Sequence, residues 1–181
     1  MFKYVNDISE LSHHIIGKYC GKFDIAVDAT LGNGHDCDFL KKNFKKVYAF
    51  DIQENSINQY KDKNENTNVI CICDCHSKIN QHIPESIDCA IYNLGYLPGG
   101  DKNITTTYET TLRSLEASLE KLNNGGIISI AIYHGHDAGA VEKEFILSFL
   151  KKLNSKVYGV MTHNFYNRSE KAPILAVIEK R

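Results

Sequence analysis

Residues 27–36, VDATLGNGHD, decide the fold. The apolar run DIAVDA predicts a strand that ends at residue 29, and apolar residues at helical spacing predict a helix over 36–44. Gly32 and Gly34 permit the tight turn and the close backbone approach that such a junction requires. The stretch therefore predicts a strand, a glycine-rich turn and a helix, which together form the first unit of a parallel α/β sheet.

The rest of the chain continues this alternation. Gly125 and Gly126 are expected to end the fourth helix, since glycine commonly follows a helix. The last two strands have no helical pattern between them and are expected to pair as an antiparallel hairpin. We expect a mainly parallel, seven-stranded sheet with helices on both faces. The predicted helices cover residues 7–20, 36–44, 53–62, 107–122 and 140–153. The predicted strands cover residues 24–29, 46–52, 68–73, 88–94, 127–133, 157–165 and 173–180.

The composition is typical of one globular domain over residues 1–181, with 43% hydrophobic and 24% charged residues. No run approaches the ~18 apolar residues of a membrane helix. The first residues lack the apolar core of a signal peptide, so we expect a cytoplasmic protein without a membrane partner. The net charge of −1 excludes attraction of nucleic acid by the molecule as a whole. Local lysine clusters such as 151–156 are either RNA contacts or solvated helix ends.

The six cysteines do not form a zinc pattern, since no C-x-x-C occurs among them. Cys71, Cys73 and Cys75 alternate, so on a strand they share one face and are expected to act as small apolar side chains in a buried strand. Such spacing on an extended strand is poor geometry for tetrahedral zinc. We expect no metal site.

The charges around the first turn select the kind of ligand. Asp28 and Asp36 flank the glycines, and the third glycine of the dinucleotide fingerprint is absent after Gly34. Carboxylates suit the ammonium and sulfonium of S-adenosylmethionine and repel the pyrophosphate of a dinucleotide. The turn therefore favours S-adenosylmethionine over NAD; the alternative is a turn needed only for packing.

The ends of the second and third strands complete this candidate cofactor site. Asp51 follows Gly34 by 17 residues (51 − 34), where an acidic residue accepts hydrogen bonds from ribose hydroxyls. Gln53 is expected near the sugar or base, and the segment at Cys75 and His76 near the adenine edge. The neighbouring Asp74 is either part of this edge or a helix cap.

The fourth strand ends in Asn93-Leu94-Gly95-Tyr96, a pattern typical of amine methyltransferases. The Asn93 amide oxygen and the next backbone carbonyl can accept hydrogen bonds from an amine and aim its lone pair at a methyl carbon. Tyr96 can stack on a base. The alternative is that Asn93 only ends a strand and Tyr96 fills core. His134, at the end of the fifth strand, is expected to accept the proton, unless water does so or the histidine is structural.

The motifs DATLGNGHD, YAFDIQ, NLGYLPGGDK and YHGH, with Asn167 and Pro173, resemble the YtqB/MnmM family of tRNA methyltransferases over about residues 13–180. The chain departs from the family at Cys37, where threonine is usual, and at Ala172, where a proline is usual. The resemblance implies a Rossmann-like class I methyltransferase fold that uses S-adenosylmethionine and releases S-adenosylhomocysteine. It also implies methylation of the 5-aminomethyl group on the wobble uridine, 2-thiolated or not, in the tRNA anticodon stem-loop.

Carried onto this sequence, the resemblance implies two sets of contacts. The cofactor side comprises Asn33, Asp36, Asp51, Gln53, Cys75 and His76. The substrate side comprises Asn93, Tyr96, Asp101, Tyr133, His134 and Asn167. Alternative functions are methylation of a nitrogen on rRNA or on a small molecule, and a non-catalytic protein that binds the cofactor or RNA. A homodimer is a further expectation, because one chain of this size offers little surface to a folded tRNA.

Overall fold

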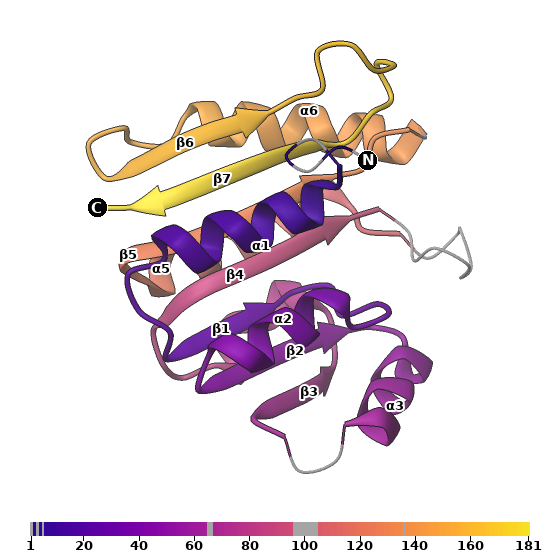
Figure 1. The fold of residues 1–181 in the computed structure, drawn as a ribbon, viewed down its shortest axis with the longest axis vertical. Coiled ribbons are helices and arrows are strands. Elements are labelled where there is room, and N and C mark those ends of the chain that lie inside the picture. Colours follow the sequence, from indigo (N-terminus) through magenta and orange to yellow (C-terminus); the bar gives the residue numbers. More distant parts are fainter. Residues whose placement is uncertain (1, 3, 5, 65–66, 96–104, 136) are drawn as a thin grey trace.

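The computed structural model describes residues 2, 4, 6–64, 67–95, 105–135 and 137–181. A seven-stranded sheet in the order β3-β2-β1-β4-β5-β7-β6 organises them (Figure 1). Strands β1 to β5 are parallel, and β7 runs antiparallel to both β5 and β6. The predicted α/β fold is confirmed. The strands are β1 (Ile25–Asp28), β2 (Lys46–Asp51), β3 (Val69–Cys73), β4 (Ile87–Leu94), β5 (Leu122–Ile132), β6 (Tyr158–His163) and β7 (Ile174–Lys180).

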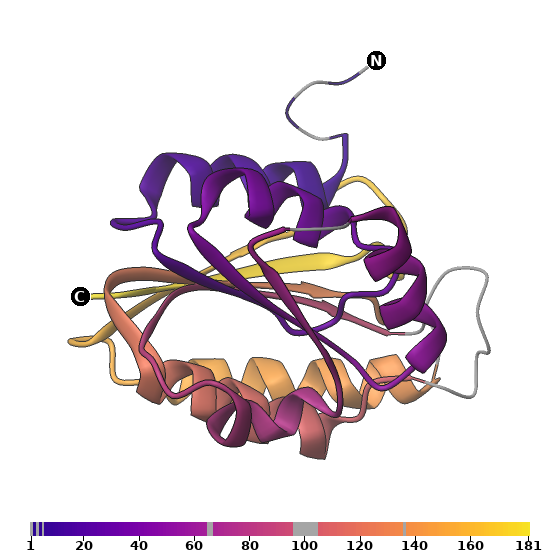
Figure 2. The ribbon, with the colours of Figure 1, turned by 90° about the horizontal axis from the view of Figure 1, so that it is seen from below.

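Helices cover both faces of the sheet. Figure 2 shows α1 and α2 on one face and α5 and α6 on the other. Each face has its own buried cluster: Ile16 and Leu40 lie in the first, Leu115 and Ile146 in the second. The helices are α1 (Ile8–Tyr19), α2 (His35–Asn43), α3 (Glu54–Lys63), α4 (Ile79–His82), α5 (Tyr108–Lys121) and α6 (Asp137–Lys151), with a 3-10 turn η1 (His76–Lys78) before α4. None of the helices in the described part of the chain is long and apolar enough to cross a membrane.

Strand β1 lies at the point where the strand order reverses. Its neighbours are β2 on one side and β4 on the other, so the connections that leave β1 and β4 diverge. A crevice opens at such a point, beyond the carboxyl ends of the parallel strands. This topology places a ligand site where the glycine-rich turn follows β1.

The prediction that Gly125 and Gly126 end a helix is wrong, because both glycines lie inside β5. Gly125 has a left-handed backbone (φ 76°), and its carbonyl accepts a hydrogen bond from the Gly21 N–H at 2.9 Å. A side chain on Gly126 would lie within 2.7 Å of the Leu122 side chain. The glycines therefore permit an irregular backbone at the start of β5, where the β4–β5 register shifts.

The prediction of a buried third strand is also wrong. Among the described strands, β3 is an edge strand that pairs with β2 alone, so Cys73 is exposed and Cys71 is half-buried. Between β3 and β4 the sequence predicted no element, whereas the chain forms η1 and the single turn α4. One turn is too short to show a helical period.

Candidate active site at the carboxyl edge of the sheet

A cavity of about 920 Å³ lies at the carboxyl ends of β1, β2 and β4. Its size is within the range of cavities that hold small molecules and cofactors. Nine of the described residues that line it were assigned to the site from the sequence, and they come from segments spread over a hundred positions. They are Gly32, Asn33, Asp36, Asp51, Gln53, Cys75, His76, Asn93 and Tyr133.

The glycine-rich turn forms one wall of the cavity. Gly32 and Gly34 have left-handed backbones, with φ of 49° and 82°. A side chain on Gly34 would lie 2.3 Å from the Tyr60 ring, so only glycine fits there. Gly34 does not itself line the cavity; as the residue before α2 it turns the first N–H groups of this helix toward the same edge.

Asp51, at the end of β2, accepts hydrogen bonds from the backbone of this wall and from the backbone that follows β2. One carboxylate oxygen accepts the Gly32 N–H at 2.9 Å, and the other accepts the Gln53 N–H at 2.8 Å. Each oxygen retains a second lone pair that can accept a ligand hydroxyl. Asp51 therefore shapes the turn and offers acceptors to the cavity at once.

Asp28 lies beneath the cavity rather than in its lining. It is wholly buried; one oxygen accepts the Thr30 N–H at 3.1 Å, and the other has no hydrogen-bond partner. Burial raises the pKa of Asp28 well above 3.8, and the nearby charges of Asp36 and Asp51 raise it further. The folded protein thus favours the neutral carboxyl of Asp28, and a cation bound beside Asp36 and Asp51 would reduce the repulsion that these carboxylates exert on it.

A hydrogen-bonded chain links α1, α2 and β4 beside the cavity. His13 Nε2 donates to one Asp36 oxygen at 2.6 Å, and its ring stacks on Phe39 with centroids 4.1 Å apart. Asn93 Nδ2 donates to the other Asp36 oxygen. Because the amide nitrogen is engaged in this way, Asn93 Oδ1 is left as an acceptor, and it is buried without a partner. Sequence reasoning missed His13, which lies 23 residues from Asp36.

His76 presents a neutral ring at the third strand end. Burial lowers its pKa to about 4, and its Nδ1 has no hydrogen-bond partner. The Asp74 carboxylate has a pKa of about 2, held down by hydrogen bonds from Lys78 and His82. Asp74 also accepts the Cys75 N–H at 2.8 Å and lines the cavity. The N-cap of η1 is Cys75, without a side-chain cap, so Asp74 belongs to the cavity lining rather than to a helix cap.

Four threonines that sequence reasoning missed also line the cavity. Thr105, Thr106, Thr107 and Thr110 line the cavity at the start of α5. The Thr106 hydroxyl donates to the buried Glu142 carboxylate of α6 at 2.7 Å and accepts the Gly95 N–H at 3.0 Å. The consecutive threonines at 105–107 were the available signal, but only the fold brings Glu142 beneath them.

The predicted substrate residues divide into three groups. Tyr133 lines the cavity, and burial raises its pKa. His134 does not line it: its Nε2 donates to the Glu170 carbonyl at 2.8 Å, so the predicted role of proton acceptor has no support in this geometry. Asn167 is exposed and outside the lining. Tyr96 and Asp101 lie outside the described residues.

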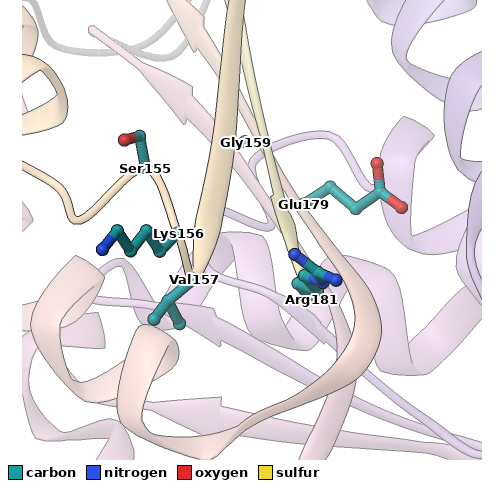
Figure 3. Close-up of a pocket in the computed structure, with 6 residues that line it drawn as sticks. All are labelled: Ser155, Lys156, Val157, Gly159, Glu179 and Arg181. Carbon is teal, nitrogen blue, oxygen red and sulfur yellow. The ribbon is translucent and has the colours of Figure 1, made fainter.

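Two other features of the described residues bear on the site. No group of three or more His, Cys, Asp or Glu side chains among them is arranged to hold a metal ion. A second hollow of about 300 Å³ lies at the far ends of β6 and β7, lined in part by Lys156 and Glu179. Figure 3 shows these two side chains pointing away from each other, so they do not converge on a ligand.

Comparison with known proteins gives consistent matches. A family model described as "Putative rRNA methylase" matches residues 47–179. The Arabidopsis thaliana protein "tRNA (mnm(5)s(2)U34)-methyltransferase, chloroplastic" is 34% identical over 190 residues, which cover 96% of this chain and 69% of that protein.

Solved structures agree with these matches. One from Clostridium thermocellum, with the same rRNA-methylase description, has a TM-score of 0.91 and 38% identity over 98% of this chain and 99% of that chain. A "putative methyltransferase" from Streptococcus mutans, in complex with SAH, has a TM-score of 0.88 and 39% identity over the whole of both chains. The chain therefore belongs to this rRNA-methylase family and has the Rossmann-like methyltransferase fold, as the YtqB/MnmM resemblance implied.

Proposed function

We propose that residues 1–181 form a single S-adenosylmethionine-dependent methyltransferase domain. Its product is 5-methylaminomethyluridine, made from 5-aminomethyluridine, with or without the 2-thio group, at the tRNA wobble position. The observation that carries the proposal is a cavity lined by carboxylates and by Asn93, whose Oδ1 is buried without a hydrogen-bond partner. The match to a plant protein named for this tRNA reaction supports the substrate.

The donor set of the cavity fits S-adenosylmethionine. When bound there, this cofactor supplies a methyl group on a positively charged sulfur. The Asp36 carboxylate, which lines the cavity, suits a cationic methionine moiety. Asp51 is proposed to accept both ribose hydroxyls. Gly32, Asn33, Gln53, Cys75 and His76 complete the proposed cofactor contacts, and Gly34 acts through the shape of the turn.

Asn93 is proposed to hold the substrate amine. Its Oδ1 can accept an N–H of the amine, and the Leu94 carbonyl, which already accepts the Tyr133 N–H at 3.2 Å, has a second lone pair. Two acceptors aim the nitrogen lone pair at the methyl carbon and remove much of the entropic cost of alignment. Because His134 Nε2 is hydrogen-bonded to the Glu170 carbonyl, we propose that water accepts the proton that the amine releases. Tyr96 and Asp101 remain proposed contacts to the base and the RNA.

A second candidate is methylation of a nitrogen on rRNA, which the name of the matching family favours. It shares every cofactor contact and differs only in the surface that meets the RNA. A small-molecule amine as substrate, or cofactor binding without turnover, would leave RNA unmodified.

Nucleoside mass spectrometry tests the proposal. tRNA that carries 5-aminomethyluridine is incubated with the protein and S-adenosylmethionine, then digested and compared with a parallel reaction on rRNA. We expect 5-methylaminomethyluridine only from the tRNA reaction that contains the methyl donor. Methylation of rRNA with unchanged tRNA would support the second candidate and contradict the first.

Assembly and compartment stay predictions. We propose a homodimer, in which the edge strand β6 and its exposed Met161 offer an unpaired surface. Light scattering coupled to gel filtration would contradict this if it gave the mass of one chain at every concentration. The predicted cytoplasmic location is checked by cell fractionation.

A further inference from the structure

The lining of the cavity includes a lysine side chain that the proposed chemistry does not use. Among the described residues that line it, Lys171 is the sole lysine or arginine, while Asp36, Asp51 and Asp74 supply negative charge. Lys171 is exposed at the cavity rim, and a side chain built on Gly135 would lie 3.9 Å from its Cβ. A lysine beside a site for a cationic cofactor suggests that an anionic group of the substrate arrives here.

Lys171 belongs to the loop of residues 164–173, which joins β6 to β7. This loop lies at the same end of the sheet as the carboxyl end of β4 (Figure 1). The loop is anchored near both ends. Phe165 packs half-buried against the core under α1 and α2, and the Arg168 guanidinium lies 3.7 Å from the centre of its ring. At the other end, the His134 ring holds the Glu170 carbonyl at 2.8 Å.

Tyr166 projects from this anchored loop and is fully exposed, at 104% of the reference area. The neighbouring Phe165 is half-buried against the core, so the two adjacent aromatic rings have different environments. A single exposed aromatic residue is ordinary on a protein surface. Tyr166, however, lies on an anchored loop that also carries Lys171 at the cavity rim. An aromatic ring that can stack on a base is thus placed on the same loop as a cation that can contact a phosphate.

Resting on the proposed function, we propose that the loop 164–173 is the docking element for single-stranded RNA. Lys171 pairs with a backbone phosphate at the cavity rim, and Tyr166 stacks on an unpaired base that flanks the target uridine. Stacking combined with a basic contact is how proteins commonly hold unpaired RNA. With a net charge of −1, the protein needs such a local device, since its overall field does not attract RNA.

The test measures binding of an anticodon stem-loop RNA by fluorescence anisotropy. Tyr166→Ala is expected to weaken binding about tenfold, whereas Tyr166→Phe retains affinity because the ring still stacks. Lys171→Ala is expected to weaken binding and to reduce the slope of log K against log salt by about 0.7 to 1. Tyr19→Ala and Lys22→Ala, exposed positions away from the loop, serve as matched controls and are expected to bind as wild type does.

The outcomes separate this inference from the proposed function. If wild type methylates the tRNA but both loop variants bind the stem-loop within twofold of it, the docking role is overturned and the reaction stands. If Tyr166→Phe loses as much affinity as Tyr166→Ala, stacking is overturned. If wild type binds the stem-loop through these residues but does not methylate it, the proposed function fails and the docking element stands. If wild type does not bind the stem-loop, the inference is overturned.

Discussion

Buried aspartates at the amino ends and at the carboxyl ends of the parallel strands differ in their hydrogen bonding. Asp88, at the start of β4, is satisfied: one oxygen accepts the N–H groups of Asp24 and Ile25 at 2.9 and 3.1 Å, and the other accepts the Asn123 side chain at 2.8 Å. Asp28, at the far end of the neighbouring β1, has an oxygen with no partner and a raised pKa.

The contrast extends beyond these two residues. Among the described residues, the buried side-chain atoms without a hydrogen-bond partner all lie at or under the carboxyl edge: Asp28 Oδ2, His76 Nδ1, Asn93 Oδ1 and Thr105 Oγ1. An unsatisfied buried polar group costs free energy, so its concentration at one edge needs a reason. The buried polar groups at the amino ends of the strands stabilise the fold, whereas those at the carboxyl ends include donors and acceptors that remain available to ligands.

Replacing Asn93 should produce the largest effect. In Asn93→Ala the acceptor that aims the amine is lost, and kcat/KM for the tRNA substrate is expected to fall at least about a hundredfold, equal to about 2.7 kcal/mol. Steady-state kinetics measure this, with Asn58→Ala, exposed on α3, as the control. A change of less than about threefold, under roughly 0.7 kcal/mol, would remove the assigned role.

Removing the satisfied carboxylate should weaken the fold. Asp88→Ala leaves three donors without their acceptor, and we expect the free energy of unfolding to drop by about 2 kcal/mol. Urea denaturation measures the drop, and Glu120→Ala on the exposed side of α5 is the control. A loss no larger than that of the control would mean that the buried polar groups at the amino ends of the strands do not stabilise the protein in this way.

Asp51→Ala should act mainly on the cofactor. Loss of the ribose acceptors and of the ties to Gly32 and Gln53 is expected to weaken S-adenosylmethionine binding about tenfold, equal to about 1.4 kcal/mol. Isothermal titration calorimetry gives the dissociation constant. The exposed Asp62→Ala on α3 is expected to bind as wild type does. Unchanged affinity in Asp51→Ala would exclude the ribose assignment.

Asp28→Asn should be the smallest change and should have the opposite sign. Because the folded state raises the pKa of Asp28 above 3.8, its stability contribution is fully present below that value and is lost as pH rises toward the folded-state pKa. Asparagine does not titrate, so the variant should gain a few degrees in Tm at neutral pH and little in acid. Calorimetry between about pH 4 and pH 8 measures this. A variant less stable than wild type at neutral pH would contradict the account.

Much of the candidate site was predictable because its motifs are local. The turn around Gly32 and the strand ends at Asp51 and Asn93 reach the cavity by the general rule that ligands bind at the carboxyl ends of parallel strands. Residues that lie at the site only because distant helices pack beside it were not predictable. His13 and Glu142 reach the site from helices at opposite ends of the chain, and neither carries a motif.

The sequence by itself determined the alternation of strands and helices, the glycine-rich turn, and the acidic and amide groups beside it. These follow from side-chain periodicity and backbone sterics, which act within a few residues. Only the tertiary structure decided that β3 is an exposed edge, that Gly125 enters a strand, that Asp28 lies beneath the cavity and that His134 turns to the loop. Burial and hydrogen-bond partners depend on which distant segments pack together, and no local pattern encodes that choice.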